Sequence, residues 1–426
     1  MRRSAARWAL MALCSAITAI GQPTALTLRE AEAIALKNHP RLRAAEFQAE
    51  VAGFQARQTQ SASLPQINGV GTASLADHGS RVGAGGLNAP DLFTRGAYGL
   101  SIQQLLYDSG RNRELTAGAR AREQSRRESV RAQRAEILLR VRQTYFQALR
   151  AQRTREVAIQ TRSNRELLLR QITALAQSSI RSILDVNFAE VAAAEAEILV
   201  ARAENDQRIA LVELSAALGL SEERAFTLAD EPLPDAPPNV VDQLVQDAGS
   251  RRPELAALKR QVEAARHQYE ADRLLNYPSV AATGVAGHIP AGDQRLRPRY
   301  AGVGINLNIP LLNGGFNEAR REESRANLAS AEAELRDFEL RVSREVRVAF
   351  LDMQNARSQM DLTARYLDRS SRVLRLAQTR YEAGLGGIVE LNQAELARTT
   401  AEIANANSRY EYQIRRAVLD FQTGLL

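Results

Sequence analysis

The stretch NIPLLNGGFNEARREES, residues 308–324, joins two kinds of chain. Before Gly314 and Gly315 the residues alternate as in a strand, and after them the pattern is helical as far as about Ala383. The stretch QQLLYDSGRNRELTAGA, residues 103–119, has the same change around Gly110. Glycine permits the φ values that a sharp corner needs. We therefore expect a sheet wall that turns abruptly into a helical wall, once in each half of the chain.

The two junctions belong to an internal repeat. His39-Pro40-Arg41-Leu42 returns 213 residues later as Arg252-Pro253-Glu254-Leu255, and Gly110-Arg111-Asn112 returns 205 residues later as Gly315-Phe316-Asn317. A constant register of this kind indicates duplication. We predict a first repeat over 22–220, an acidic, proline-rich linker over 221–239 and a second repeat over 240–426. Each repeat is expected to run helix, strand, strand, very long helix, helix.

The first 21 residues are predicted to be a signal peptide. Arg2, Arg3 and Arg7 precede an apolar core from Trp8 to Ile20, and a small-x-small site follows. A membrane anchor is the alternative, but about 13 apolar residues are too few to span a bilayer. Removal of the segment lowers the formal charge from +7 to +4 and leaves no cysteine. This modest excess, on helices that mix both signs, gives no support to a nucleic-acid partner.

The expected strands have one apolar and one polar face. In YAGVGINLNIP, residues 300–310, glycine and asparagine alternate with large apolar residues, namely Val303, Ile305, Leu307 and Ile309. Tyr98, Leu100 and Ile102 alternate with Gly99, Ser101 and Gln103 in the same way, and residues 67–74 more faintly. The pattern fits equally a surface hairpin over a helical core and a membrane barrel with an apolar outside.

The helices that follow are unusually long and poor in large aliphatic residues. At 1.5 Å per residue, about 66 residues make roughly 100 Å of helix. Between Gly110 and Ile137 only Leu115 and Val130 are large aliphatics. Such helices can pack through alanine seams as the wall of a water-filled tube, or as a solvated coiled coil without a lumen. The other helices are roughly half as long as these. They are the leading helices, at about 27–61 and 240–275, and the return helices, at about 183–217 and 388–422. His39-Pro40 is expected to mark a kink or break in the first leading helix.

Four strands cannot close a barrel, because the smallest useful closed sheet has about eight. Open edges in lipid would leave backbone groups unpaired at several kcal/mol each. If the strands lie in a membrane, several copies must therefore share one barrel, and three copies would supply twelve strands.

The junction IPLLNGGFNEARREESRANLASAEAEL, residues 309–335, resembles that of the TolC family of outer-membrane efflux proteins. LTLREAEAIALKNHPRL, RRPELAALKRQVEAA and RYEAGLGGIVELNQAE, at 26–42, 251–265 and 380–395, resemble other parts of that family. The resemblance implies a mainly α protein with a small β part. It implies a homotrimer whose 12-stranded β-barrel lies in the outer membrane and continues into a long periplasmic α-helical barrel. A periplasmic adaptor and an inner-membrane pump are the implied partners, beside outer-membrane lipid.

The resemblance also places candidate gate residues where each long helix turns back. Tyr381 matches a gate tyrosine, and Glu390 and its first-repeat equivalent Asp185 match positions for constriction carboxylates. Three copies of both acids would form a ring that attracts cations, or the acids favour helix N-termini through the dipole. Arg181 occupies the first-repeat position of a possible gate arginine, where the second repeat has Gly386. Ser179 departs from the usual tip glycine. The candidate adaptor contacts are Ile180, Ile183, Gly384, Leu385 and Ile388.

The sequence offers no catalytic or metal-binding pattern, so an enzyme and a cofactor are not expected. The histidines at 39, 78, 267 and 288 lack metal-ligand spacing, and Val82-Gly83-Ala84-Gly85-Gly86 lacks the context of a phosphate loop. We predict a passive outer-membrane conduit of a tripartite efflux system. A conduit for type I protein secretion and a periplasmic coiled-coil scaffold are the alternatives.

Overall fold

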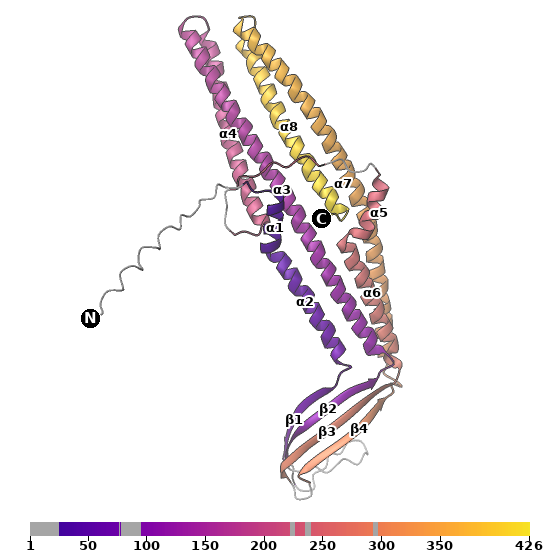
Figure 1. The fold of residues 1–426 in the computed structure, drawn as a ribbon. Coiled ribbons are helices and arrows are strands. Elements are labelled where there is room, and N and C mark those ends of the chain that lie inside the picture. Colours follow the sequence, from indigo (N-terminus) through magenta and orange to yellow (C-terminus); the bar gives the residue numbers. More distant parts are fainter. Residues whose placement is uncertain (1–24, 76, 78–94, 222–225, 235–239, 293–296) are drawn as a thin grey trace, which may run out of the picture. The chain divides into compact units, whose positions relative to one another are not determined.

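A computed structural model describes residues 25–75, 77, 95–221, 226–234, 240–292 and 297–426. The predicted signal peptide, His78, the segment 82–86 and part of the predicted linker lie outside the described residues. The chain divides into two compact units, coloured along the sequence in Figure 1. The first unit contains 1–39, 137–237 and 352–418, and the second contains 40–136, 238–351 and 419–426.

Both halves of the chain have the same order of elements. The first half consists of α1 (Leu28–Asn38), α2 (Pro40–Ser61), β1 (Gln66–Ser74), β2 (Arg95–Tyr107), α3 (Arg111–Gln177) and α4 (Ile183–Ala217). The second half consists of α5 (Val241–Arg251), α6 (Pro253–Arg273), the short η1 (Leu274–Asn276), β3 (Ser279–Gly292), β4 (Arg299–Asn308), α7 (Phe316–Glu382) and α8 (Ile388–Gln422). Each half therefore has two leading helices, two strands, a long helix and a shorter return helix, and the second half has η1 in addition.

The leading helix of each half is broken. His39 and Arg252 adopt extended conformations, with φ/ψ of −71°/119° and −67°/120°, and separate α1 from α2 and α5 from α6. Each precedes a proline, which disfavours the helical conformation in the residue before it. The expected break at His39-Pro40 is confirmed. The single helix expected over 240–275 is wrong, because Pro253 acts as Pro40 does.

The four strands form one antiparallel sheet in the order β1-β2-β3-β4. Directly paired residues point to the same face. Ile102 pairs with Ile67 on β1 and with Gly284 on β3, and Gly284 pairs with Val303 on β4. The predicted alternation therefore becomes one apolar face across the whole sheet, with Asn68, Ser101, Thr283 and Asn306 on the other.

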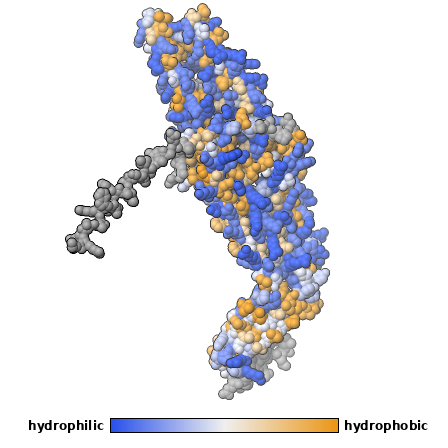
Figure 2. Space-filling view, viewed as in Figure 1, coloured by the Kyte–Doolittle hydropathy of each residue, from blue (hydrophilic) through white to orange (hydrophobic). Residues whose placement is uncertain are grey.

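The described residues leave the apolar face of the sheet uncovered. Leu100, Val303, Ile305 and Leu307 are between 60% and 94% exposed. Figure 2 shows white and orange surface over much of the visible sheet, whereas blue predominates on the helices. The alternation is that of a sheet with one side in lipid and one in water.

The sheet-to-helix corners follow the chemistry expected of the glycines. Gly110, Gly314 and Gly315 have φ of 91°, 65° and 82°. Ser109 takes the first-repeat place of Gly314 with the same left-handed backbone, at φ 57°. The backbone N–H of Gly110 donates to the Asp108 carboxylate at 3.0 Å, so this side chain holds the corner before α3 begins.

The long helices are 67 residues each and the return helices 35 residues each. In the first unit α3 packs on α4 through small residues, with Ala158, Val200 and Ala203 buried together. This is the narrow seam predicted for a helix whose other faces are polar. None of the helices in the described residues is long and apolar enough to cross a bilayer.

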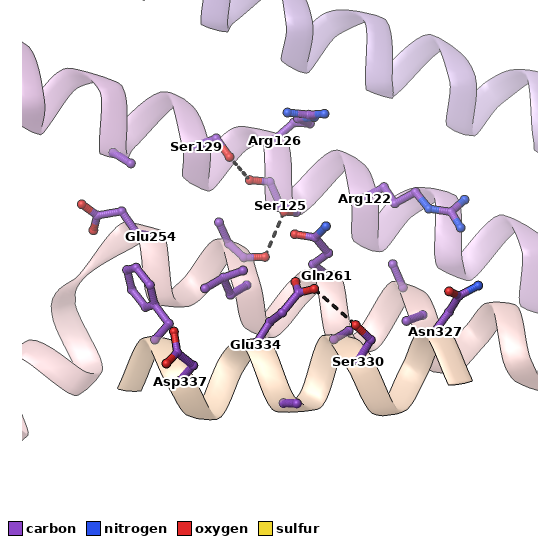
Figure 3. A pocket seen from close by; sticks show the side chains of 18 of the residues that line it. Arg122, Ser125, Arg126, Ser129, Glu254, Gln261, Asn327, Ser330, Glu334 and Asp337 are labelled. Atoms are coloured by element: carbon purple, nitrogen blue, oxygen red, sulfur yellow. Dashed lines mark hydrogen bonds between the residues drawn. The ribbon is translucent and has the colours of Figure 1, made fainter. Parts of the chain in front are cut away.

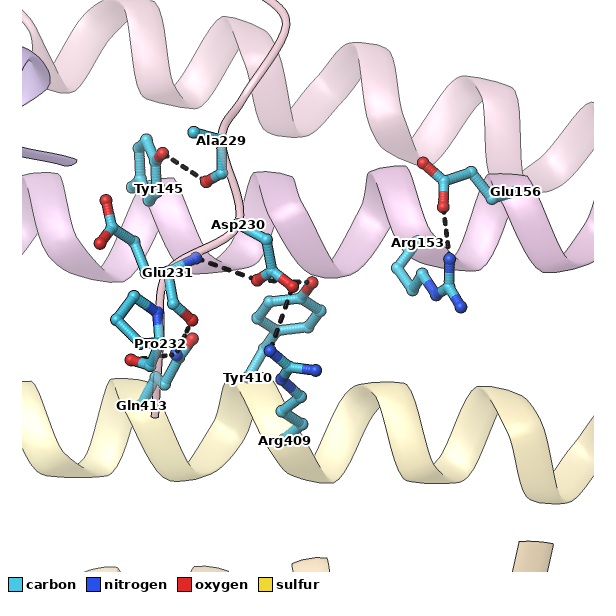
Figure 4. Close-up of polar contacts among 10 residues, drawn as sticks. All are labelled: Tyr145, Arg153, Glu156, Ala229, Asp230, Glu231, Pro232, Arg409, Tyr410 and Gln413. Carbon is cyan, nitrogen blue, oxygen red and sulfur yellow. Dashed lines mark hydrogen bonds and ion pairs between the residues drawn. The ribbon is translucent and has the colours of Figure 1, made fainter. Parts of the chain in front are cut away.

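A strap, residues 226–234, crosses the first unit and ties its helices together (Figure 4). Leu228 forms a parallel bridge with Leu26, and the buried Tyr145 hydroxyl lies 2.7 Å from the carbonyl of Ala229. On α8, Arg409 pairs with Asp230 at 3.1 Å, and the Gln413 amide donates to the carbonyl of Glu231. The strap is part of the predicted linker, so that segment is a packed structural element over these residues.

Candidate functional site

The two hairpin tips, where α3 turns into α4 and α7 turns into α8, have the same backbone form. Ser179 and Gly384 have φ of 56° and 73°. The N–H of Ile180 donates to the carbonyl of Leu175 at 3.0 Å, and the N–H of Leu385 donates to that of Arg380 at 2.8 Å. These bonds close the helix C-termini in the way a left-handed residue allows. Ser179 forms the same turn as Gly384, but its backbone is strained in this conformation, which glycine adopts without strain.

Arg181 and Tyr381 join the two tips. The Arg181 guanidinium lies 4.1 Å from the Tyr381 ring centroid and donates to the Tyr381 carbonyl at 2.6 Å. The Tyr381 side chain is buried, and its hydroxyl has no hydrogen-bond partner among the described residues. Burial raises the pKa of Tyr381, Arg181 opposes this rise, and Asp185 adds to it. Two predicted gate residues from different halves of the chain are therefore in contact.

The two predicted constriction carboxylates differ in their surroundings. Glu390 pairs with Arg380 at 3.2 Å, and both side chains are about half exposed. Asp185 has no basic group within ion-pair distance in the described part of the chain. It lies in the first turn of α4, where the helix dipole favours a negative charge. Asp185 thus keeps its charge available, whereas part of the Glu390 charge is neutralised.

The candidate adaptor contacts divide into surface and core. Ile180, Ile183 and Leu385 are 66%, 72% and 71% exposed, and Gly384 lies in the turn between α7 and α8. Ile388 is only 3% exposed and belongs to a core cluster with Tyr381 and Leu391. The prediction of Ile388 as a contact residue is wrong, because its side chain packs inward against the neighbouring helices.

A buried ion pair behind the tips was not expected from the sequence. Arg165 on α3 lies 2.7 Å from the Glu395 carboxylate on α8 and donates to the Asn392 side-chain oxygen at 2.8 Å. The side chains of Arg165 and Glu395 are 8% and 13% exposed. Both residues lie in helices crowded with arginine and glutamate, so no spacing singles them out. The contact binds the α3–α4 hairpin to the α7–α8 hairpin.

A cavity of about 1130 Å³ in the second unit lies among α2, α3, α6 and α7 (Figure 3). Its charged side chains balance, with Arg122, Arg126 and Arg341 against Glu254, Glu334 and Asp337. The Ser125 hydroxyl donates to the carbonyl of Ala257 at 2.9 Å, and that of Ser330 to Glu334 at 3.3 Å. Ser125 thus bonds a backbone carbonyl, and Ser330 bonds a carboxylate four residues away on the same helix. Between the charged side chains the lining is largely alanine, with Leu258 and Phe338.

No group of three or more metal-ligating side chains gathers within the described ranges. His267 lies 2.7 Å from the Glu114 carboxylate, and His288 stacks edge-on against Tyr98. Each of these two histidines therefore makes a contact between neighbouring elements of the fold.

A sheet with one exposed apolar face, together with two long helical hairpins, is the architecture of an outer-membrane channel protein with a helical conduit. A sequence profile of the outer membrane efflux protein family matches residues 33–220 and 244–425. The chain belongs to this family, which is one of channel proteins rather than enzymes. The predicted family, fold class and outer-membrane location are confirmed.

Individual relatives are distant. Protein CyaE of Bordetella pertussis is 27% identical over 68% of this chain, and the match spans 62% of CyaE. The outer membrane protein TolC of Salmonella enteritidis is 22% identical over 91% of this chain and 80% of its own length. A crystal structure of a membrane protein from Pseudomonas aeruginosa shares the fold with a TM-score of 0.79, at 24% identity and 93% coverage of both chains.

Proposed function

We propose that the chain is the outer-membrane channel of a tripartite efflux system. Three copies share one 12-stranded barrel, and their helices form a conduit through which small molecules leave the periplasm. A periplasmic adaptor and an inner-membrane pump supply the cargo and the energy. The chain itself is passive.

The single observation that carries this proposal is the four-stranded sheet. β1 and β4 each have one edge without a strand partner among the described residues, and one sheet face is apolar. Strands of 9 to 14 residues are long enough to cross the apolar band of an outer membrane. An unpaired edge in that band costs several kcal/mol for each backbone group. Pairing β4 of one copy with β1 of the next removes both edges.

The helices offer matching surfaces for neighbouring copies. In the second unit α2 exposes Phe47, Val51 and Phe54 at helical spacing, each more than half accessible. In the same unit α7 exposes Leu340, Val348 and Leu351 to a similar degree, and α2 and α7 flank this unit in Figure 1. Exposed apolar stripes of this kind are typical of subunit contacts. We assign them to the seams between copies.

The tips form the gate of this proposed channel. Arg181 and Tyr381 hold the two hairpins together, and Asp185 supplies a negative charge that no ion pair offsets among the described residues. Ile180, Ile183, Gly384 and Leu385 are the surface that the adaptor contacts. Opening requires the α7–α8 hairpin to move away from the α3–α4 hairpin, so the contacts between the hairpins must break.

Membrane fractionation and planar-bilayer recording test the proposal. We expect heat-sensitive oligomers in the outer membrane and channels that divalent cations block. Asp185→Asn should weaken this block more than Glu390→Gln does, because Arg380 already offsets the Glu390 charge. A water-soluble, well-folded monomer would refute the channel, and equal block in the Asp185→Asn variant would refute the cation site alone.

The alternatives differ in cargo and in location. A periplasmic scaffold is not favoured, because the chain belongs to an outer-membrane efflux family and its sheet has a lipid-like face. A protein-secretion conduit would have the same architecture. Deletion of the gene distinguishes the two cargoes: greater sensitivity to small toxic molecules supports efflux, and loss of a secreted polypeptide with unchanged sensitivity supports secretion.

A further inference from the structure

A second cavity, of about 930 Å³, lies in the first unit behind the tips, between the α3–α4 hairpin and the α7–α8 hairpin. Large aliphatic side chains from both hairpins form its walls, among them Leu168, Ile172, Leu175, Leu374 and Leu391. Its volume is in the range of small-molecule sites, which are mostly apolar with a few converging polar groups. The Arg165–Glu395 pair and the Arg181–Tyr381 contact both border it.

The charged lining of this cavity is predominantly basic. Four arginines line it, at 165, 181, 375 and 398, against two acids, Glu382 and Glu395. Arg165 is neutralised by Glu395, and Arg398 pairs with Glu402 at 3.2 Å. Neither Arg181 nor Arg375 has a carboxylate within ion-pair distance in the part of the chain that the structure describes. One of these two free charges comes from each hairpin.

Three buried polar atoms of lining residues lack hydrogen-bond partners among the described residues: the Tyr381 hydroxyl, the Nε of Arg181, and the Glu395 carboxylate oxygen that lies in the ion pair with Arg165. Tyr381 is 5% exposed overall, so its hydroxyl is cut off from bulk solvent. Leaving a buried donor unsatisfied is unfavourable, and a ligand that accepts a hydrogen bond from it removes part of that penalty. An anionic oxygen is the acceptor that suits a phenol beside a guanidinium.

We propose that this cavity binds a small amphipathic anion, with a carboxylate, sulfate or sulfonate head and an apolar body. The head lies at Arg181, Arg375 and the Tyr381 hydroxyl, and the body lies among the leucines and Ile172. Because the two arginines belong to different hairpins, the bound anion bridges them and holds the tips together. The Asp185 and Glu390 carboxylates do not line this cavity, although the Asp185 charge acts on Tyr381.

Equilibrium dialysis of 2-naphthalenesulfonate tests the site, using the full chain in lipid nanodiscs with empty nanodiscs as the blank. We expect saturable binding, weakened about tenfold by Arg375→Gln, because one charge-assisted contact is lost. Gln378→Glu, which adds an acid to the lining, should weaken binding as well. Arg369→Gln, on the same helix but outside the cavity, is the matched control and should bind as the unaltered chain does. Arg375 and Gln378 are exposed, so both variants should fold.

Three outcomes would overturn the proposal. Binding that does not exceed that of empty nanodiscs removes the site. Equal binding of the uncharged 2-naphthol shows an apolar cleft without anion recognition. An unchanged affinity in both Arg375→Gln and Gln378→Glu places the probe elsewhere. Because dialysis measures binding without transport, a failed site leaves the channel proposal standing, and a failed channel leaves the binding result interpretable.

Discussion

Replacing Arg165 by methionine removes one half of the buried ion pair that joins α3 to α8. The variant keeps the apolar part of the side chain but leaves the Glu395 carboxylate without its partner at 2.7 Å. Arg398 is the other cation that acts on Glu395, and it already pairs with Glu402. A carboxylate only 13% exposed would therefore be left largely uncompensated.

The expected costs of removing the two partners are unequal. Arg165→Met should destabilise the packing of the hairpins by about 3–5 kcal/mol, the usual cost of an unpaired buried charge. Burial raises the pKa of Glu395, and Arg165 and Arg398 offset this only in part. Glu395→Gln resembles the protonated acid and should cost less than Arg165→Met does, because the shift favours the protonated form more in the folded chain than in the unfolded one. Arg165 would keep its bond to Asn392.

The same pKa shift gives a sign to the pH dependence. A raised pKa means that the folded tip binds its proton more tightly than the unfolded chain does. The stabilisation is complete below the ordinary value of 4.5 and is lost as the pH rises through the raised pKa of Glu395. Glu395→Gln should flatten this dependence.

Hydrogen exchange over residues 160–172 and 388–400 of the assembled protein measures the free energy of local opening. Arg162→Gln is the matched control, because Arg162 pairs with Glu166 on the same helix and both are 42% exposed. Such a surface pair contributes at most about 1 kcal/mol. The double variant Arg165→Met/Glu395→Met should recover most of the loss. Equal losses for Arg165→Met and Glu395→Gln, or a loss in Arg165→Met no larger than in the control, would refute this account.

Three further predictions concern backbone strain and alkaline stability. Ser179→Gly should stabilise the protein by about 1 kcal/mol in thermal unfolding, because φ is 56° there, whereas Ser178→Gly should not. Gly424→Ala should lower the free energy of unfolding by more than about 2 kcal/mol, because φ is 73° and the added Cβ would lie 2.9 Å from Arg251. The control Gly249→Ala, which has open space in α5, should leave stability unchanged or raise it. Equal effects of the two variants would contradict this account. Burial, followed by Asp230, raises the pKa of Tyr410 to about 12, so stability should fall as the pH rises from about 10 through 12. Tyr410→Phe should lessen that fall in denaturant titrations. An equal loss of stability at alkaline pH in the variant and the unaltered chain would contradict the prediction.

The order of elements was predictable because local physics determines it. Val303, Ile305 and Leu307 alternate with small residues, so their side chains must share one face of the strand. The two glycines after Asn313 adopt the positive φ values that the corner needs. The return helices were placed correctly at 183–217 and 388–422, because their first residues follow turns and their ends precede Gly219 and Gly424. These signals lie within a few residues of the features they determine.

Contacts between distant segments were not predictable from one sequence. Tyr300 lies over Gly99 and Gly287, and a Cβ at either glycine would come within 2.6 Å of its ring or hydroxyl. The strap and the Arg165–Glu395 pair likewise join residues more than 80 positions apart. Composition gives no sign of them, because the chain has many arginines and acids, and only the packing of helices decides which of them meet.

The two tips show how a duplicated fold acquires unlike halves. Arg380 neutralises Glu390 in the second tip, whereas Leu175 stands 205 residues earlier and leaves Asp185 unpaired. Likewise Tyr381 corresponds to Ala176, and Arg181 corresponds to Gly386, so each tip has one member of the cation–π contact and lacks the other. Two copies of either tip as it stands would lack one of the two partners. The contact therefore depends on the difference between the tips, and because each partner lies on a different hairpin, moving the hairpins apart must break it.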